Sequence, residues 1–174
     1  MANLESDAFV FFGATGDLAF RQVFPALQSL IRRNAFNGPI VGVARSAATV
    51  DALRERARAS LEAHGGIDPE AFAKLSERLR YVNGDYQEQT TYLRLRSALS
   101  ESKRPLYYLA IPPELFPTVA KGLATSSCND RIAHMCEDID AQVSRHNIII
   151  ARKNMRFAKY RPDRYWSGWT CAAL

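Results

Sequence analysis

The chain has 174 residues, of which 47% are hydrophobic, and a net charge of +5 at pH 7. This size suits one domain with a substantial core, and the sequence has no apolar run of about 18 residues that could cross a membrane. Acidic residues stand near the N-terminus where a signal peptide carries basic ones, so we expect a cytoplasmic protein with no membrane partner. Most of the positive excess lies after residue 127 without any nucleic-acid-binding signature, which indicates a solvated surface.

Strand and helix patterns alternate along the first 125 residues. Residues 8–12 are a short apolar and aromatic run, typical of a strand covered on both faces. Apolar side chains then recur at helical spacing from Phe20 to Ile31, and Pro25 is expected to kink this helix because proline removes a backbone donor.

The same alternation continues to residue 124. Further strands are predicted at 40–44, 79–82 and 106–110, and further helices at 50–64, 69–78, 92–99 and 114–124. Strands that alternate with helices pair in parallel through right-handed crossovers. The pattern therefore predicts an α/β fold with a Rossmann-like, doubly wound parallel sheet.

The alternation stops near residue 128. The remaining segment has one apolar triplet, which predicts a strand at 147–151, and otherwise mixes polar and aromatic residues without a period. Its cysteines, Cys128, Cys136 and Cys171, are odd in number and lack CxxC spacing, so we expect reduced thiols and no metal site. We place a domain boundary at residue 131 and treat residues 132–174 as an irregular tail.

Two glycines follow the first predicted strand directly. Gly13 and Gly16 allow a tight turn and a close approach of the backbone to a ligand, and Ala19 is a third small position that lets helix and strand pack. The helix start offers unpaired N–H groups to a phosphate, so the turn predicts dinucleotide binding. A purely structural turn is the alternative, and Asp17 can likewise be only a favourable acid in a first helical turn.

The end of the second predicted strand bears on the choice of coenzyme. NAD-binding sites usually carry an acid there, whereas this strand ends in Arg45 and Ser46. A guanidinium suits a phosphate, so we expect NADP rather than NAD. Two later strand ends, at Asp85 and Tyr86 and at Tyr108 to Pro112, should border the same crevice, although turn chemistry explains the first equally well.

Four segments together carry a family resemblance. The stretches FVFFGATGDLAFRQVFPAL, IVGVARS, GDY and LYYLAIPPELF, in this order and spacing, resemble the N-terminal coenzyme domain of glucose-6-phosphate dehydrogenase over about residues 7–131. The resemblance implies oxidation of glucose 6-phosphate to 6-phosphogluconolactone with NADP, the entry step of the oxidative pentose phosphate pathway. Residues 1–131 would then form the NADP-binding domain.

The resemblance also implies roles for single residues. The glycine turn would hold the pyrophosphate, Arg45 the 2′-phosphate, Asp85 and Tyr86 would lie near the adenine, and Tyr108 near the nicotinamide. The complete set of expected coenzyme-binding residues is Gly13, Ala14, Thr15, Gly16, Asp17, Leu18, Ala19, Arg45, Ser46, Asp85, Tyr86, Tyr108 and Pro112.

The sequence departs from the family pattern in four respects. Phe20, Arg21 and Gln22 stand where the family has a basic run, so one expected lysine contact is missing. The Glu-Lys-Pro-Phe-Gly and Arg-Ile-Asp-His-Tyr-Leu-Gly-Lys motifs are absent, as is the α+β domain that forms the sugar site and the oligomer interface. We therefore expect an incomplete sheet, no catalytic residue, glucose 6-phosphate binding only if that domain is supplied, and no oligomer without it.

Three further interpretations stay open at this point. The loss of the family pattern near Arg131 suggests a change of reading frame in the C-terminal segment. A stand-alone NADP-binding or sensing module without chemistry is the alternative function. Trp166 and Trp169 in the basic tail could stack on single-stranded nucleic acid, which is the least favoured hypothesis.

Overall fold

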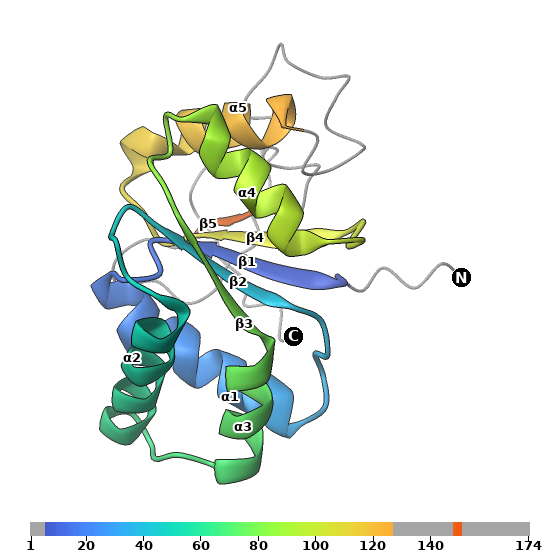
Figure 1. The fold of residues 1–174 in the computed structure, drawn as a ribbon. Coiled ribbons are helices and arrows are strands. Elements are labelled where there is room, and N and C mark those ends of the chain that lie inside the picture. Colours follow the sequence, from blue (N-terminus) through green and yellow to red (C-terminus); the bar gives the residue numbers. More distant parts are fainter. Residues whose placement is uncertain (1–5, 127–147, 151–174) are drawn as a thin grey trace, which may run out of the picture.

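A computed structural model describes residues 6–126 and 148–150 of the chain (Figure 1). Five parallel strands form one sheet in the order β3-β2-β1-β4-β5. The strands are β1 (Ala8–Phe12), β2 (Ile40–Ala44), β3 (Leu79–Asn83), β4 (Pro105–Leu109) and β5 (Ile148–Ile150). The first strand lies at the centre, so the predicted doubly wound α/β sheet is confirmed.

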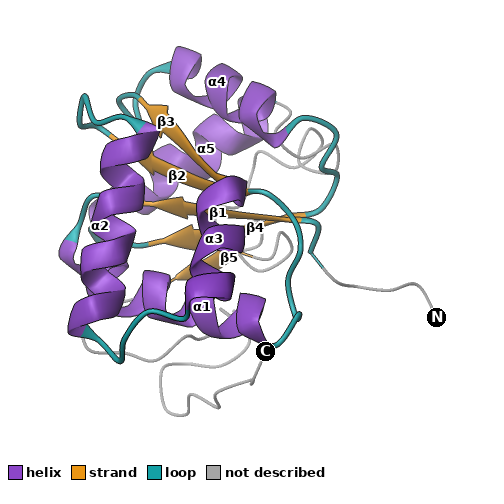
Figure 2. Cartoon of the chain, turned by 60° about the horizontal axis from the view of Figure 1, so that its bottom comes forward, coloured by secondary structure: helices purple, strands orange, loops and turns teal. Residues whose placement is uncertain are grey.

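Helices cover both faces of the sheet. The π-helical η1 and helices α1, α2 and α3 lie on one face, and α4 and α5 lie on the other (Figures 1 and 2). Their bounds are η1 (Ala19–Val23), α1 (Phe24–Arg32), α2 (Val50–Ala63), α3 (Pro69–Arg78), α4 (Gln89–Leu99), the 3₁₀ turn η2 (Pro113–Leu115) and α5 (Phe116–Thr125). Within the described ranges, no helix combines the length and apolar character needed to cross a bilayer.

Burial on both faces explains the uninterrupted apolar run of β1. Every residue of this strand is buried. Phe11 belongs to the core under α1, α2 and α3, where its ring meets the Phe24 ring edge-on at 5.8 Å, whereas Phe12 belongs to the core under α4 and α5. Both faces of this strand therefore need apolar side chains.

The helix that contains Pro25 changes its hydrogen-bond pattern just before the proline. The Phe24 N–H reaches back five residues to the Ala19 carbonyl, which is the π-helical spacing, and Pro25 then occupies the second position of α1. The next hydrogen bond of the same spacing would join the N–H of residue 25 to the Phe20 carbonyl, but Pro25 has no N–H. The Ser60 hydroxyl of α2 donates to that carbonyl instead. The sequence predicted that Pro25 disturbs this helix, and the structure shows that a π-helical turn and a side-chain donor accommodate it.

Element ends differ from the predictions by a few residues. The fourth strand begins with Pro105 and ends at Leu109, which is one residue earlier than predicted, because a proline is tolerated at the first position of a strand. Helix α4 begins at Gln89, three residues before the predicted start. The helix predicted at 114–124 begins as the 3₁₀ turn η2 and becomes α-helical at Phe116.

The strand predicted at 147–151 is observed as β5. It pairs in parallel with β4, with Tyr108 opposite Ile149. One edge of the sheet therefore comes from the segment after residue 131, whose sequence has no regular period. The boundary at residue 131 stays a prediction, and the three cysteines and both tryptophans lie outside the described residues.

Candidate functional site

The glycine turn lies where the strand order of the sheet reverses. After β1 the chain moves to β2 on one side, and after β3 it crosses to β4 on the other side, so β1 and β4 flank the crevice in which ligands of open α/β sheets bind. Gly13 has a φ of +81°, and a Cβ atom there would lie 2.2 Å from the carbonyl oxygen of Ala110, just past the end of β4. Only glycine fits this position.

Hydrogen bonds fix the first half of the turn to its neighbours. The Gly13 and Ala14 N–H groups donate to the Val43 carbonyl of β2 at 2.9 and 3.2 Å. The Gly16 N–H then donates to the Gly13 carbonyl at 2.9 Å, which closes the turn. Ala14 is completely buried. These contacts make the turn rigid before any ligand binds.

The second half of the turn offers free donors. Within the described part of the chain, no protein acceptor pairs with the N–H groups of Thr15, Asp17 or Leu18. They stand at the start of a helix, where the backbone carries partial positive charge. An anion such as a pyrophosphate fits donors of this kind.

Tyr86 contacts the glycine turn through its hydroxyl group. The Gly13 N–H also donates to the Tyr86 hydroxyl at 3.1 Å, and that hydroxyl lies 3.4 Å from the Val43 carbonyl, to which it donates. The ring is 5% exposed and packs edge-on against Phe12. Burial raises the pKa of the Tyr86 hydroxyl, so it stays protonated well above neutral pH. Sequence reasoning expected Tyr86 beside the adenine and did not anticipate this contact with the turn.

Arg45 presents a cation beside this support. Its guanidinium carbon lies 6.0 Å from the centre of the Tyr86 ring, and its side chain is exposed. None of the ion pairs found among the described residues includes Arg45. Its charge is therefore available to an anionic ligand at the end of β2.

Ser46 is held more tightly than its neighbour. The Tyr81 hydroxyl donates to the Ser46 carbonyl at 2.7 Å and lies 2.9 Å from the Ser46 hydroxyl. Tyr81 lies in the middle of β3, so this pair joins β3 to the segment that follows β2. The Ser46 hydroxyl already has a protein partner, so the exposed Arg45 side chain is the better placed of the two to bind a ligand.

The two acidic residues of the predicted set have local partners. Asp17 forms an exposed ion pair with Arg21 at 3.0 Å and does not cap the helix. The Asp85 carboxylate accepts the Gln87 N–H at 2.9 Å, which is the turn chemistry that the sequence left open. No cluster of three or more metal-ligating side chains occurs in the described part of the chain.

The two remaining predicted residues lie at and just beyond β4. Tyr108 is fully buried among the side chains under α1, and its ring centre is 6.3 Å from that of Phe9. This burial raises the pKa of the Tyr108 hydroxyl. Pro112 is exposed and begins the turn into η2. The structure thus brings the glycine turn, Arg45 and Tyr86 together, and places the Tyr108 ring in the core.

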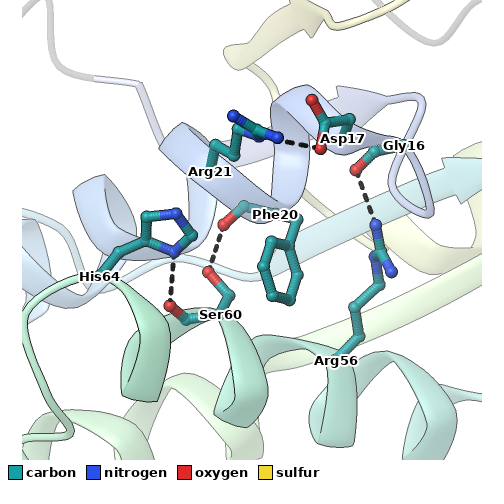
Figure 3. Close-up of polar contacts among 7 residues, drawn as sticks. All are labelled: Gly16, Asp17, Phe20, Arg21, Arg56, Ser60 and His64. Carbon is teal, nitrogen blue, oxygen red and sulfur yellow. Dashed lines mark hydrogen bonds and ion pairs between the residues drawn. The ribbon is translucent and has the colours of Figure 1, made fainter.

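One charged residue at the turn was missed by sequence reasoning. Arg56 of α2 donates from Nη2 to the Gly16 carbonyl at 3.0 Å, and its guanidinium carbon lies 5.0 Å from the centre of the Phe20 ring (Figure 3). A cation therefore lies over the side chain that stands where the family resemblance implied a basic residue. The helical spacing puts Arg56 next to the buried Ala57, but the sequence does not indicate which neighbouring element it reaches.

Comparison with known proteins identifies the same region. The family model described as "Glucose-6-phosphate dehydrogenase, NAD binding domain" matches residues 10–145. Glucose-6-phosphate 1-dehydrogenase 1 of Mycobacterium tuberculosis is 40% identical over 119 residues, which cover 68% of this chain and 26% of that protein. The cytoplasmic glucose-6-phosphate 1-dehydrogenase 6 of Arabidopsis thaliana is 35% identical over 136 residues and covers 70% and 26%.

Solved structures agree with the sequence relatives. The crystal structure of glucose-6-phosphate 1-dehydrogenase from Mycobacterium avium superposes with a TM-score of 0.72 at 34% identity, and covers 84% of this chain and 35% of that one. A glucose-6-phosphate dehydrogenase in complex with glucose 6-phosphate shares the fold, with a TM-score of 0.69 at 23% identity and coverage of 87% and 38%. The chain spans about a quarter of the length of the curated relatives named above. It belongs to the glucose-6-phosphate dehydrogenase family, and residues 10–145 correspond to the family's NAD binding domain.

Proposed function

We propose that this chain binds NADP at the carboxyl edge of its sheet, as the coenzyme domain of a glucose-6-phosphate dehydrogenase. The observation that carries the proposal is the juxtaposition of two features. They are N–H groups in the turn after β1 without an acceptor, and an exposed arginine at the end of β2 without an ion-pair partner, both among residues 6–126 and 148–150. The N–H groups of Thr15, Asp17 and Leu18 would bind the pyrophosphate. Arg45 would bind the 2′-phosphate that distinguishes NADP from NAD.

The residues around the turn would keep these donors in place. Gly13 is held by Val43 of β2 and by the Tyr86 hydroxyl, so the turn does not need to reorganise when a ligand binds. Preorganised donors avoid the entropy of ordering a loop on binding. We place Tyr86 in this supporting role, while Arg45, which lies over its ring, would face the ribose end of the coenzyme.

The reaction proposed for the complete enzyme is the oxidation of glucose 6-phosphate in the cytoplasm, as the first step of the oxidative pentose phosphate pathway. A bound nicotinamide coenzyme would supply the hydride acceptor for this oxidation. The turn and Arg45 would bind and orient the coenzyme for that transfer. These 174 residues contain neither the Glu-Lys-Pro-Phe-Gly nor the Arg-Ile-Asp-His-Tyr-Leu-Gly-Lys motif, so we propose that they bind coenzyme without turning over the sugar.

Calorimetry together with an activity assay tests this proposal. We expect heat of binding with NADP, weaker binding with NAD, and no reduction of NADP when glucose 6-phosphate is added to the purified chain. Reduction of NADP on addition of glucose 6-phosphate would refute the proposal that the chain binds coenzyme without oxidising the sugar. The absence of binding to either coenzyme by folded protein would refute the assignment of the glycine turn.

A further inference from the structure

Arg56 contacts the glycine turn from the neighbouring helix. Nη2 donates to the Gly16 carbonyl at 3.0 Å, and the guanidinium lies over the Phe20 ring. Figure 3 shows the side chain rising from α2 toward the turn, on the opposite side of Phe20 from the Ser60 contact. The guanidinium is thus placed by two independent contacts.

Among the described residues, no acidic side chain forms an ion pair with Arg56. In the described ranges, Arg21, Arg54 and Arg58 each form an ion pair with an acidic residue, whereas Arg56 forms none. Its Nε atom is buried and has no hydrogen-bond partner there. A buried, unmatched N–H on a charged group is costly, so the Gly16 contact and the Phe20 ring are the compensations that hold it.

The Gly16 carbonyl is chemically joined to one of the free donors. A peptide unit is planar, so the Gly16 C=O and the Asp17 N–H belong to one rigid plane and point in opposite directions. The Gly16 carbonyl also accepts the Phe20 N–H at 3.2 Å, which fixes the plane from the helix side. A cation on the oxygen orients the Asp17 N–H and polarises it, which makes it a stronger donor.

We propose that Arg56 is a positioning residue that orients and polarises the Asp17 N–H for the pyrophosphate of the dinucleotide. The inference rests on the proposed function, because it assumes that the turn binds a pyrophosphate. Arg56 acts on the part of the ligand that NADP and NAD share. Arg45, by contrast, is proposed to contact the phosphate that only NADP carries. Substitution of Arg56 should therefore weaken the binding of both coenzymes, whereas substitution of Arg45 should weaken the binding of NADP alone.

Binding of both coenzymes to three variants tests the proposal. Arg56→Gln removes the charge, and we expect the Kd for NADP and for NAD to rise by the same factor, about threefold to tenfold, as for one hydrogen bond. Arg56→Lys keeps a cation and a donor, and should raise both Kd values by a smaller common factor. Arg58→Gln removes a charge from the same helix where it pairs with Glu55, and should leave both Kd values unchanged.

A second measurement does not depend on the coenzyme. In an amide NMR spectrum of the free protein, Arg56→Gln and Arg56→Lys should move the Asp17 amide resonance, whereas Arg58→Gln should not. If Arg56 had only a structural role, its variants would have a lower melting temperature, but the Asp17 amide resonance would not move. The affinities of the fully folded variants for NADP and NAD would then also stay unchanged. If Arg56→Gln does not fold, the coenzyme titrations and the amide NMR spectrum are recorded with the Arg56→Lys variant alone.

The outcomes separate this inference from the proposed function. If the unmodified chain binds neither coenzyme, the proposed function fails and the inference fails with it. If the chain binds coenzyme but the Arg56 variants bind both forms as tightly as before, or lose NADP alone, only the inference is overturned. An unmoved Asp17 amide resonance in the variants would also overturn it.

Discussion

The Ser60 hydroxyl donates a hydrogen bond to the backbone carbonyl of Phe20 and so supplies the donor that Pro25 lacks. The π-helical turn before Pro25 directs the Phe20 carbonyl toward a residue without an N–H. Ser60 is completely buried on α2, and its own carbonyl accepts from Nδ1 of His64 at 2.8 Å. A proline near the start of the first helix is thus accommodated by a serine 35 positions later in the sequence.

Removing this hydroxyl should destabilise the fold measurably. Ser60→Ala leaves a buried carbonyl without a partner, and we expect the free energy of unfolding to fall by about 1–3 kcal/mol. Chemical denaturation followed by circular dichroism measures this change. Ser97→Ala, at an exposed position of α4, is the matched control and should change stability by less than about 0.5 kcal/mol.

A double-mutant cycle tests the link to Pro25 itself. Pro25→Ala restores an N–H at position 25 that can pair with a carbonyl of the preceding turn. In that background the cost of Ser60→Ala should become smaller. Equal costs of Ser60→Ala in the two backgrounds would show that Ser60 does not replace the missing donor.

Gly13 should tolerate no side chain. In Gly13→Ala the new Cβ atom meets the Ala110 carbonyl, a backbone atom that cannot rotate away, and the φ of +81° is unfavourable for alanine. We expect a loss of more than about 3 kcal/mol, visible as a large drop in melting temperature. Gly65→Ala, at a φ of +115° with no described heavy atom within 4 Å of the new Cβ, adds backbone strain alone and should cost about 1–3 kcal/mol. Similar losses in the two variants would contradict the close approach of β1 and β4.

The buried tyrosines predict how stability responds to alkaline pH. Burial raises the pKa of Tyr108 in the folded protein above its ordinary value of 10.0, so the unfolded chain loses this proton first. The contribution of Tyr108 to stability is therefore fully present below pH 10 and decreases as the pH rises further. Tyr108→Phe should reduce the slope of unfolding free energy against pH above 10 by up to about 1.4 kcal/mol per pH unit. Denaturation curves between pH 8 and about 11 measure it, and an unchanged slope would contradict the burial of this hydroxyl.

The features that sequence reasoning predicted correctly are those that depend on neighbouring residues. The run at 8–12 indicated a strand covered on both faces because its side chains alternate between two apolar cores. Gly13 indicated a tight turn because no other residue readily adopts its backbone conformation. Arg45 follows its strand directly and is exposed in the structure, whereas its contact with the 2′-phosphate stays a prediction.

The contacts that were missed join residues far apart in the sequence. Tyr86 reaches Gly13 across 73 positions, and Arg56 reaches Gly16 across 40. Both depend on which helix lies beside which loop, and the spacing of residues within one element does not contain that information. The same holds for Tyr81, whose hydroxyl occupies the Ser46 side chain that had been expected to face the coenzyme.

Titration of both coenzymes into the Arg45→Ala variant shows whether Arg45 binds the 2′-phosphate. We expect the Kd for NADP to rise by about tenfold to a hundredfold, the range for a hydrogen-bonded charge, while the Kd for NAD stays within about twofold. Arg32→Ala removes an exposed charge at the far end of α1 and should change neither value. Equal weakening of both coenzymes by Arg45→Ala, or an unchanged affinity for NADP, would contradict the assignment of this arginine to the 2′-phosphate.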